Sequence, residues 1–208
     1  LWIQSMVKNF DKGTEIVLGY GSYFAQNTFL SKLISYDTLF ICIQYMGFAL
    51  KGYPYMGVGR NLAYRRSSFF YHKGFAGMLH LQSGDDDLFV NEIANANNTK
   101  VEISHQSKTS SVPKQTFKQW LIQRERHLST SAFYKKETLR SISTEVLSRG
   151  VFYASVLACF LTSDILCLIA LGMLLVRLAI QVTSINLSAK VLNERHFYLL
   201  IPLFDILI

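Results

Sequence analysis

The chain has few charged residues and few cysteines, and each shortage argues against one kind of protein. Only 17% of its 208 residues are charged, whereas 50% are hydrophobic. Intrinsic disorder is excluded, because disordered chains combine low hydrophobicity with dense charge. The three cysteines, Cys42, Cys159 and Cys167, are odd in number and lack the spacing of metal ligands. A disulfide framework is therefore not expected.

Charge is also unevenly placed along the chain. The formal net charge is +7, and in residues 151–208 three basic and three acidic side chains cancel. The whole excess of positive charge therefore belongs to residues 1–150. Between positions 100 and 150 there are ten basic and four acidic residues. This balance favours an anionic ligand and an anionic membrane surface.

Residues 151–185 form the longest apolar run, with Asp164 and Arg177 as its only charges. A soluble core helix is seldom apolar on all faces over such a length, so we expect membrane insertion. One tilted span fits the pattern, and so does a tight hairpin that turns near Thr162, Ser163 and Asp164. At such a turn Asp164 would be solvated, whereas an acid inside a bilayer is usually functional.

Three segments are expected along the chain. Residues 1–136 alternate strand-like and helix-like pieces, which favours an α/β layer with a mostly parallel sheet. Residues 137–150 carry apolar side chains at helical spacing, as in an amphipathic helix that lies flat at the membrane surface, and an ordinary surface helix fits them equally. Residues 151–208 are expected to be a truncated transmembrane region. Because the chain opens at Leu1 and closes inside an apolar stretch, we expect a piece cut at both ends.

Local patterns within the first segment predict individual elements. Strands are expected at residues 15–18, 61–64 and 100–104, helices at 28–43 and 83–93, and loops at 52–59, 95–100 and 106–114.

The densest acidic cluster is Asp85, Asp86 and Asp87, which follows Ser83 and Gly84. Three adjacent carboxylates repel one another, so a cation, a helix N-terminus or a role in proton transfer must offset the cost. A helix N-terminus is the simpler of these explanations, and proton transfer is the functional alternative.

A basic cluster runs from Gln123 to His127 with the sequence QRERH. On a helix Gln123, Arg126 and His127 would share one face. Arginine binds phosphate oxygens in bidentate fashion, which suits a diphosphate leaving group. A solvated helix face is the simpler interpretation of such a segment.

Residues 57–66 have the sequence GVGRNLAYRR, with two glycines ahead of a predicted strand. Glycine has no side chain, so a ligand or another backbone can approach it closely. The segment is not a dinucleotide-binding fingerprint, because its glycine spacing differs and the loop precedes the strand.

The order of these motifs is more specific than any one of them. GVGRNLAYRR, SGDDDLF, QRERH and then apolar segments resemble the acceptor-side half of a membrane-anchored family-2 glycosyltransferase, similar to bacterial cellulose and poly-N-acetylglucosamine synthases. The resemblance covers nearly the whole chain. It implies a partial GT-A (Rossmann-like) domain in residues 1–136, followed by the interfacial helix and transmembrane helices. It also implies the bacterial plasma (inner) membrane, and the basic domain favours the cytoplasmic side.

The resemblance assigns the catalytic base. The family's Thr-Glu-Asp motif supplies this base, and setting Ser83-Gly84-Asp85 against it places the base at Asp85. Because Gly84 stands where the family has glutamate, the register stays open by one residue and Asp86 is the second choice. Asp87 and Leu88 then fall on the Asp-Leu pair that often follows the motif.

The resemblance also assigns residues that bind substrate. The family's Gln-x-x-Arg-Trp helix implies that the QRERH helix lies beside the nucleotide diphosphate and the acceptor. His127 stands where tryptophan is usual, which argues against polymer synthesis. The residues assigned to substrate binding are Gln123, Arg124, Arg126, His127, Gly59, Asn61 and Arg66.

The implied reaction is an inverting transfer from a nucleotide-diphosphate sugar donor to a glycan or lipid-linked acceptor. Asp85 would take the proton of the attacking hydroxyl, and Mg²⁺ or Mn²⁺ would help to stabilise the departing diphosphate. The Asp-x-Asp pair that holds this metal is expected upstream of Leu1, so no metal ligand is assigned here and the piece alone is expected to be inactive. The alternative is a non-catalytic, membrane-anchored basic module that binds anionic glycan or lipid. The bilayer is an expected partner, and nucleic acid is not.

Overall fold

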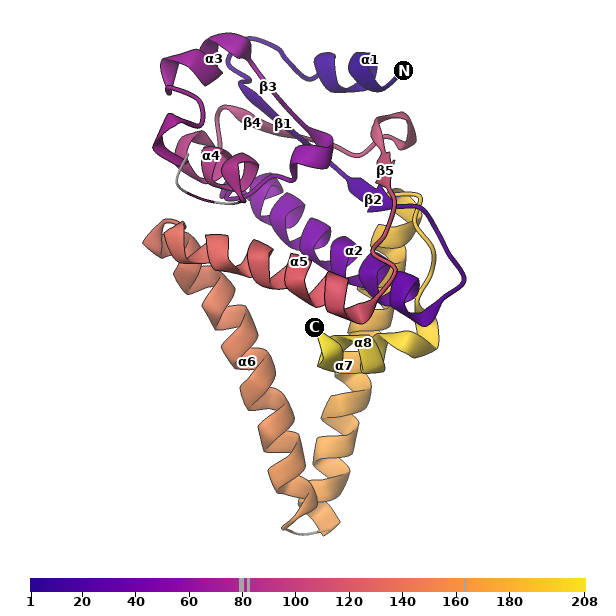
Figure 1. Cartoon of the computed structure of the whole chain (residues 1–208). Helices are drawn as coiled ribbons and strands as arrows, with labels where there is room; N and C mark the ends of the chain where they lie inside the picture. Colours follow the sequence, from indigo (N-terminus) through magenta and orange to yellow (C-terminus); the bar gives the residue numbers. More distant parts are fainter. Residues whose placement is uncertain (79–80, 82, 163) are drawn as a thin grey trace.

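The computed structural model describes residues 1–78, 81, 83–162 and 164–208 of the chain. It shows a mixed α/β layer with a long helical hairpin extending from it (Figure 1). Helix α5 (Phe117–Thr130) lies across the molecule between these two parts. The GT-A fold itself stays a prediction.

Strand β1 (Ile16–Gly19) is the centre of a three-stranded sheet. It pairs antiparallel with β3 (Leu62–Tyr64) and parallel with β4 (Thr99–Glu102). In this register Ile16 lies opposite both Tyr64 and Thr99. All four residues of β1 are buried, as expected for the central strand of a covered sheet. The predicted strands at 15–18, 61–64 and 100–104 correspond to these three.

A second, two-stranded sheet was not predicted. Strand β2 (Gly21–Tyr23) pairs parallel with β5 (Thr109–Ser111). The prediction of a continuous loop over residues 106–114 is therefore wrong, because β5 lies inside it. The Ser22 hydroxyl adds to this pairing, since it donates to the Thr109 carbonyl at 3.0 Å. Two of the three strand pairs in the described residues are parallel.

Helix α2 (Phe29–Leu50) packs against both sheets and contributes more buried core residues than any other described element. The Thr28 hydroxyl caps it by accepting from the Ser31 N–H at 3.1 Å, and the helix continues seven residues beyond its predicted end at position 43. Leu33, Leu39 and Tyr45 on its buried face are each 1% exposed or less. Although α2 is long and apolar enough to cross a membrane, 56% of its most apolar window is buried inside the protein.

Shorter elements complete the α/β layer. They are the helices α1 (Trp2–Val7), α3 (Arg66–Tyr71) and α4 (Asp85–Ile93), together with the 3₁₀ turns η1 (Gly59–Asn61), η2 (Ala76–Met78), η3 (His105–Ser107) and η4 (Ser131–Phe133).

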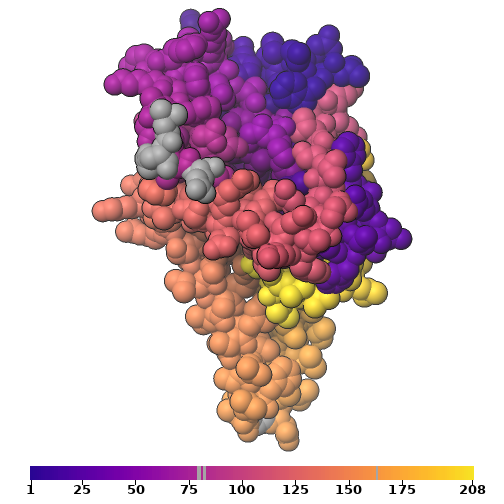
Figure 2. Space-filling view, in the orientation of Figure 1, coloured from indigo at the N-terminus to yellow at the C-terminus, as the bar shows by residue number. Residues whose placement is uncertain are grey.

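Helices α6 (Lys136–Phe160) and α7 (Asp164–Val191) form the hairpin, so the apolar run is not one continuous helix. The predicted turn residue Ser163 lies outside the described residues, and Thr162 and Asp164 flank it. Only 6% of the most apolar window of α7 is buried, and the hairpin projects as a narrow stalk (Figure 2). Helix α7 is therefore long, apolar and exposed enough to span a membrane.

Helix α6 also corrects the predicted boundary at position 150. Residues 137–150 do not form a separate helix, because α6 runs without interruption from Lys136 to Phe160. Gly150 does not break it, since glycine costs a helix only about 1 kcal/mol. The segment expected to lie flat is instead the upper part of one arm of the hairpin (Figure 1).

The last elements, η5 (Tyr198–Leu200) and α8 (Ile201–Leu207), are tied to both arms of the hairpin. The Asp205 carboxylate is fully buried and accepts a hydrogen bond from the Tyr153 hydroxyl at 2.6 Å. It also forms ion pairs with Arg177 at 3.2 Å and Arg149 at 3.6 Å. Since Tyr153 and Arg149 belong to α6 and Arg177 to α7, this carboxylate bridges the two arms.

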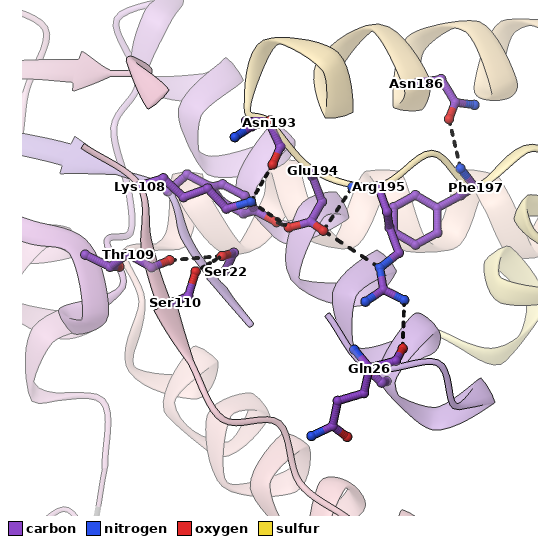
Figure 3. A network of polar contacts seen from close by, with 12 residues as sticks. Ser22, Gln26, Lys108, Thr109, Ser110, Asn186, Asn193, Glu194, Arg195 and Phe197 are labelled. Carbon is purple, nitrogen blue, oxygen red and sulfur yellow. Dashed lines mark hydrogen bonds and ion pairs between the residues drawn. The ribbon is translucent and has the colours of Figure 1, made fainter. Parts of the chain in front are cut away.

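A polar cluster joins the end of α7 to the α/β layer (Figure 3). Lys108, next to β5, donates to the Asn193 carbonyl at 2.5 Å and pairs with Glu194 at 3.3 Å. Arg195 donates to the Gln26 carbonyl at 3.1 Å. These contacts fix the hairpin to the edge of the second sheet.

Candidate active site

The acidic turn of α4, the glycine-rich loop and α5 meet in one place. Gly84 precedes α4 with a φ of 87°, and a Cβ there would lie 2.2 Å from Thr130 Cγ2 at the end of α5. A Cβ on Gly59 would lie 2.6 Å from Asp86 Oδ2. Both positions require glycine for close approach, and the Gly84 backbone favours glycine in any case. The two glycines therefore let α4 dock against its neighbours.

The three adjacent carboxylates face three different environments. Asp85 is exposed, and it accepts no hydrogen bond and forms no ion pair within the described part of the chain. Asp86 is half-buried and accepts a hydrogen bond from the Gly59 N–H. Asp87 is 5% exposed, and its Oδ2 accepts from the Tyr134 hydroxyl at 2.7 Å. All three belong to the first turn of α4, where the helix dipole favours negative charge.

Two titratable groups at this junction have shifted pKa values. Burial raises the pKa of Asp87 to about 7, and the charge of Asp86 adds to this, while the Tyr134 hydrogen bond opposes it. Burial and the nearby charge of Arg126 lower the pKa of His127, and Asp86 opposes this shift. At neutral pH His127 is therefore neutral, and Asp87 is close to its titration midpoint.

Two cavities adjoin the junction. An outer cavity of about 570 Å³ is lined by residues that include Gly59, Asp85, Asp86 and His127. An inner cavity of about 430 Å³ lies among α2, α5 and α6, and Asp87 and His127 both line it. His127 is thus shared by the two cavities. The structure brings six of the predicted site residues to them: Gly59, Asp85, Asp86, Gln123, Arg124 and His127.

The inner cavity has aromatic walls, and two of the three acids in its lining form ion pairs. Tyrosine and tryptophan side chains line much of it: Tyr20, Tyr23, Tyr45, Tyr55, Trp120 and Tyr134. Within its lining, Arg124 lies 3.4 Å from Asp37, and Arg149 lies 3.6 Å from Glu145. The aromatic faces suit a neutral, hydroxyl-bearing ligand, while Arg60, in the same lining, forms no ion pair among the described residues.

The α5 residues divide into those that face the inner cavity and those that do not. Gln123 lines it and donates to the Tyr23 hydroxyl at 3.2 Å. Arg124 also lines it, but its guanidinium pairs with Asp37 and donates to the Ile208 carbonyl at 2.8 Å. Arg126 is exposed and lines neither cavity. The predicted diphosphate-binding role of Arg124 therefore competes with contacts that it already makes.

The structure does not bring Asn61 and Arg66 to either cavity. The Asn61 amide is buried, donating to the carbonyls of Tyr20 at 2.8 Å and Ser107 at 2.6 Å, while its oxygen accepts from the Trp2 indole at 2.9 Å. Arg66 begins α3 beyond the far end of β3 and lies over the Phe70 ring. Asn61 joins three segments of the fold, and Arg66 is a surface residue of α3.

Sequence reasoning did not assign Arg60 or Tyr134 to the site. Arg60 lines the inner cavity, lies 4.2 Å above the centre of the Tyr23 ring and donates to the Ser22 carbonyl at 3.3 Å. Its place in the GVGRN segment was the available signal. Tyr134 follows η4, and no pattern in the sequence indicates that its hydroxyl reaches Asp87.

No group of three or more His, Cys, Asp or Glu side chains within the described ranges is arranged to hold a metal ion. The acids of α4 do not fit a divalent site, because Asp86 and Asp87 turn to different partners. The divalent metal stays a prediction that depends on residues outside this chain. Comparisons with protein-family models, with curated proteins and with solved structures found no match.

Proposed function

We propose that this chain forms the acceptor side of a membrane-bound glycosyltransferase, which moves a sugar from a nucleotide-diphosphate donor to a hydroxyl group with inversion. The observation that carries the proposal is the meeting of the acidic turn of α4 with the QRERH helix α5 at two cavities that share His127. These segments lie far apart in the chain, and the motif order alone does not require them to meet.

Asp85 is the carboxylate best suited to act as the general base. A base must reach the attacking hydroxyl within about 2.6–3.2 Å and must be free to accept its proton. Asp86 already accepts from the Gly59 N–H, and Asp87 already accepts from Tyr134. Asp85 is exposed in the outer cavity, and its carboxylate has no hydrogen bond or ion pair among the residues that the structure describes. The neighbouring glycine loop leaves room for an acceptor to approach.

Arg60 and Arg126 are the cations best placed to attract an anionic donor, since Arg124 is paired with Asp37. Arg60 lines the inner cavity. The charge of Arg126 lowers the pKa of His127, whose side chain lines both cavities. Guanidinium groups stabilise the charge that develops on a departing diphosphate. A bound Mg²⁺ or Mn²⁺ would add Lewis-acid stabilisation of the same charge.

The exposed, apolar surface of α7 supports anchoring in a bilayer. The α/β layer above it carries the excess positive charge of the chain. By the positive-inside tendency, we place this layer on the cytoplasmic side of a bacterial inner membrane.

The proposal is tested in membranes of bacterial cells that produce the native polypeptide. Transfer is measured with Mn²⁺ and radiolabelled UDP-glucose, UDP-N-acetylglucosamine, UDP-galactose and GDP-mannose. We expect Asp85→Asn to lower turnover by about 10²–10⁴-fold, the usual contribution of a general base, with donor binding unchanged. Glu92→Gln, at an exposed position on the same helix, is the matched control and should keep wild-type turnover.

Full turnover in the Asp85→Asn variant would remove Asp85 from the reaction. A loss seen only in Asp86→Asn would move the base by one residue. If no donor supports transfer, while the protein still binds vesicles of anionic lipid, the chain is the non-catalytic basic module instead.

A further inference from the structure

We propose that Asp87 is a positioning residue, which uses the Tyr134 hydroxyl to fix the first turn of α4 and so to hold Asp85 in its transfer geometry. This inference rests on the proposed glycosyltransferase function. On this inference, the junction between α5 and α6, where Tyr134 lies, controls the orientation of the Asp85 carboxylate.

Helix geometry links the direction of Asp87 to that of Asp85. With about 3.6 residues per turn, residues two apart on a helix point to nearly opposite sides. Asp87 points inward and is 5% exposed, and Asp85 is exposed. A rotation of this turn that releases Asp87 would therefore turn Asp85 away from the outer cavity.

Further contacts connect α4 to the same junction. The Asn91 side chain, one turn after Asp87, accepts from the Lys135 N–H at 2.9 Å and donates to the Tyr55 carbonyl at 2.8 Å. The Lys135 ammonium donates to the Glu92 carbonyl at 3.0 Å. Since α6 begins at Lys136, the helix that bears the base is anchored directly to the start of the hairpin.

The bond to Tyr134 is itself enclosed. Tyr134 is 8% exposed, and its ring packs edge-on against Tyr55 at 6.0 Å. A buried carboxylate is costly compared with an apolar or amide side chain. A charge kept at this cost, two residues from the proposed base and in the wall of the inner cavity, suits a role in the reaction better than a role in stability.

Protonation of Asp87 changes the strength of this anchor. A hydrogen bond to an ionised acceptor is roughly twice as strong as one between neutral groups. Because the pKa of Asp87 is raised to about 7 by burial, the strong form of the anchor is populated as the pH rises through neutrality. The titratable or charged groups around Asp87 are Asp86 on its own helix, His127 on α5, Tyr134 and Lys135 at the junction, Tyr55 on the loop before η1 and Glu145 on α6.

The test is the pH profile of sugar transfer in native membranes, with donor binding measured in parallel. In the wild type we expect kcat to rise with an inflection near pH 7. Asp87→Asn should abolish that inflection and lower kcat about 10- to 100-fold, the scale of a small misplacement of a reacting group, with KM for the donor unchanged. Tyr134→Phe should also lower kcat, and it should move the inflection to higher pH, because the lost hydrogen bond had lowered the pKa of Asp87.

Folding of the variants is checked by thermal unfolding. An acid whose pKa is raised on folding gives stability that is full below its ordinary pKa and is lost as the pH rises through the raised value. For Asp87 this window runs from 3.8 to about 7, so Asp87→Asn should gain in Tm over the wild type across that window. Tyr36→Phe is the matched control, since the Tyr36 hydroxyl is buried and has no hydrogen-bond partner within the described ranges of the chain, and it should leave the pH profile unchanged.

A wild-type inflection that persists in Asp87→Asn, or wild-type kcat in both variants, would overturn the inference. If Asp85→Asn still abolishes transfer in the same membranes, only the inference fails. If Asp85→Asn transfers normally, the proposed function has failed as well.

Discussion

Asp85, Asp86 and Asp87 are neighbours in the chain, and helix geometry gives each a different partner. One is exposed, one receives the Gly59 N–H and one is buried against Tyr134. The dipole of α4 reduces the repulsion among the three carboxylates. The helix N-terminus therefore explains why the cluster is tolerated, and the proposed proton transfer gives a role to its exposed member.

The predicted site residues show that a sequence motif does not determine which of its side chains reach the site. Gly59, Asn61 and Arg66 lie in the same ten-residue segment, yet of these three only Gly59 lines a cavity. The strand that follows Asn61 continues along the outer cavity, but the Asn61 amide makes three hydrogen bonds to other segments of the fold. Residue type and spacing identified the segment, but side-chain direction depends on contacts that only the fold provides.

The contacts of Asn61 give a prediction about stability. Asn61→Ala removes its three hydrogen bonds and leaves the buried carbonyls of Tyr20 and Ser107 without this donor. An unsatisfied buried polar group costs about 1–3 kcal/mol, so we expect the free energy of unfolding to fall by roughly that amount. Chemical denaturation in detergent measures it, with Asn97→Ala at an exposed position as control. Equal stability of the two variants would contradict the structural role of Asn61.

At the scale of elements, the long pieces with local signals were predictable. Helix α4 begins at a glycine followed by acids, and α2 begins at a capping threonine. Strands β2 and β5 have three residues each and exist through pairing with one another, so no local pattern marks them. The boundary at position 150 was wrong for a related reason, since a change of composition does not end a helix.

The exposed face of α7 gives a prediction about the membrane. Leu175 lies near the middle of α7 and is 59% exposed, and a lysine near the centre of an inserted helix costs about 2.5–3.5 kcal/mol. We expect Leu175→Lys to shift the protein from the pellet to the supernatant when membranes are extracted with alkaline carbonate. Val112→Lys, at a position after β5 that is 69% exposed, should stay in the pellet. Equal extraction of the two variants would count against insertion of α7.

At the scale of the whole molecule, a basic α/β layer stands over an apolar hairpin, with α5 between them (Figures 1 and 2). The division at the start of the apolar run was visible in the sequence, because charge stops there. The bridge formed by Asp205 and the polar cluster around Lys108 and Glu194 was not, because each joins residues distant in the chain. These contacts fix the hairpin relative to the cavities.

The proposed transferase site requires the acidic turn of α4 to meet α5 in the membrane-bound protein, and cross-linking measures this most directly. In a chain whose three native cysteines are replaced by alanine, Asp86→Cys is combined with His127→Cys and treated in membranes with a short bifunctional thiol reagent. We predict a link between the two positions by peptide mass spectrometry, and none for the control pair Arg66→Cys with His127→Cys. If the first pair stays unlinked while both of its thiols react with maleimide, the shared site does not exist.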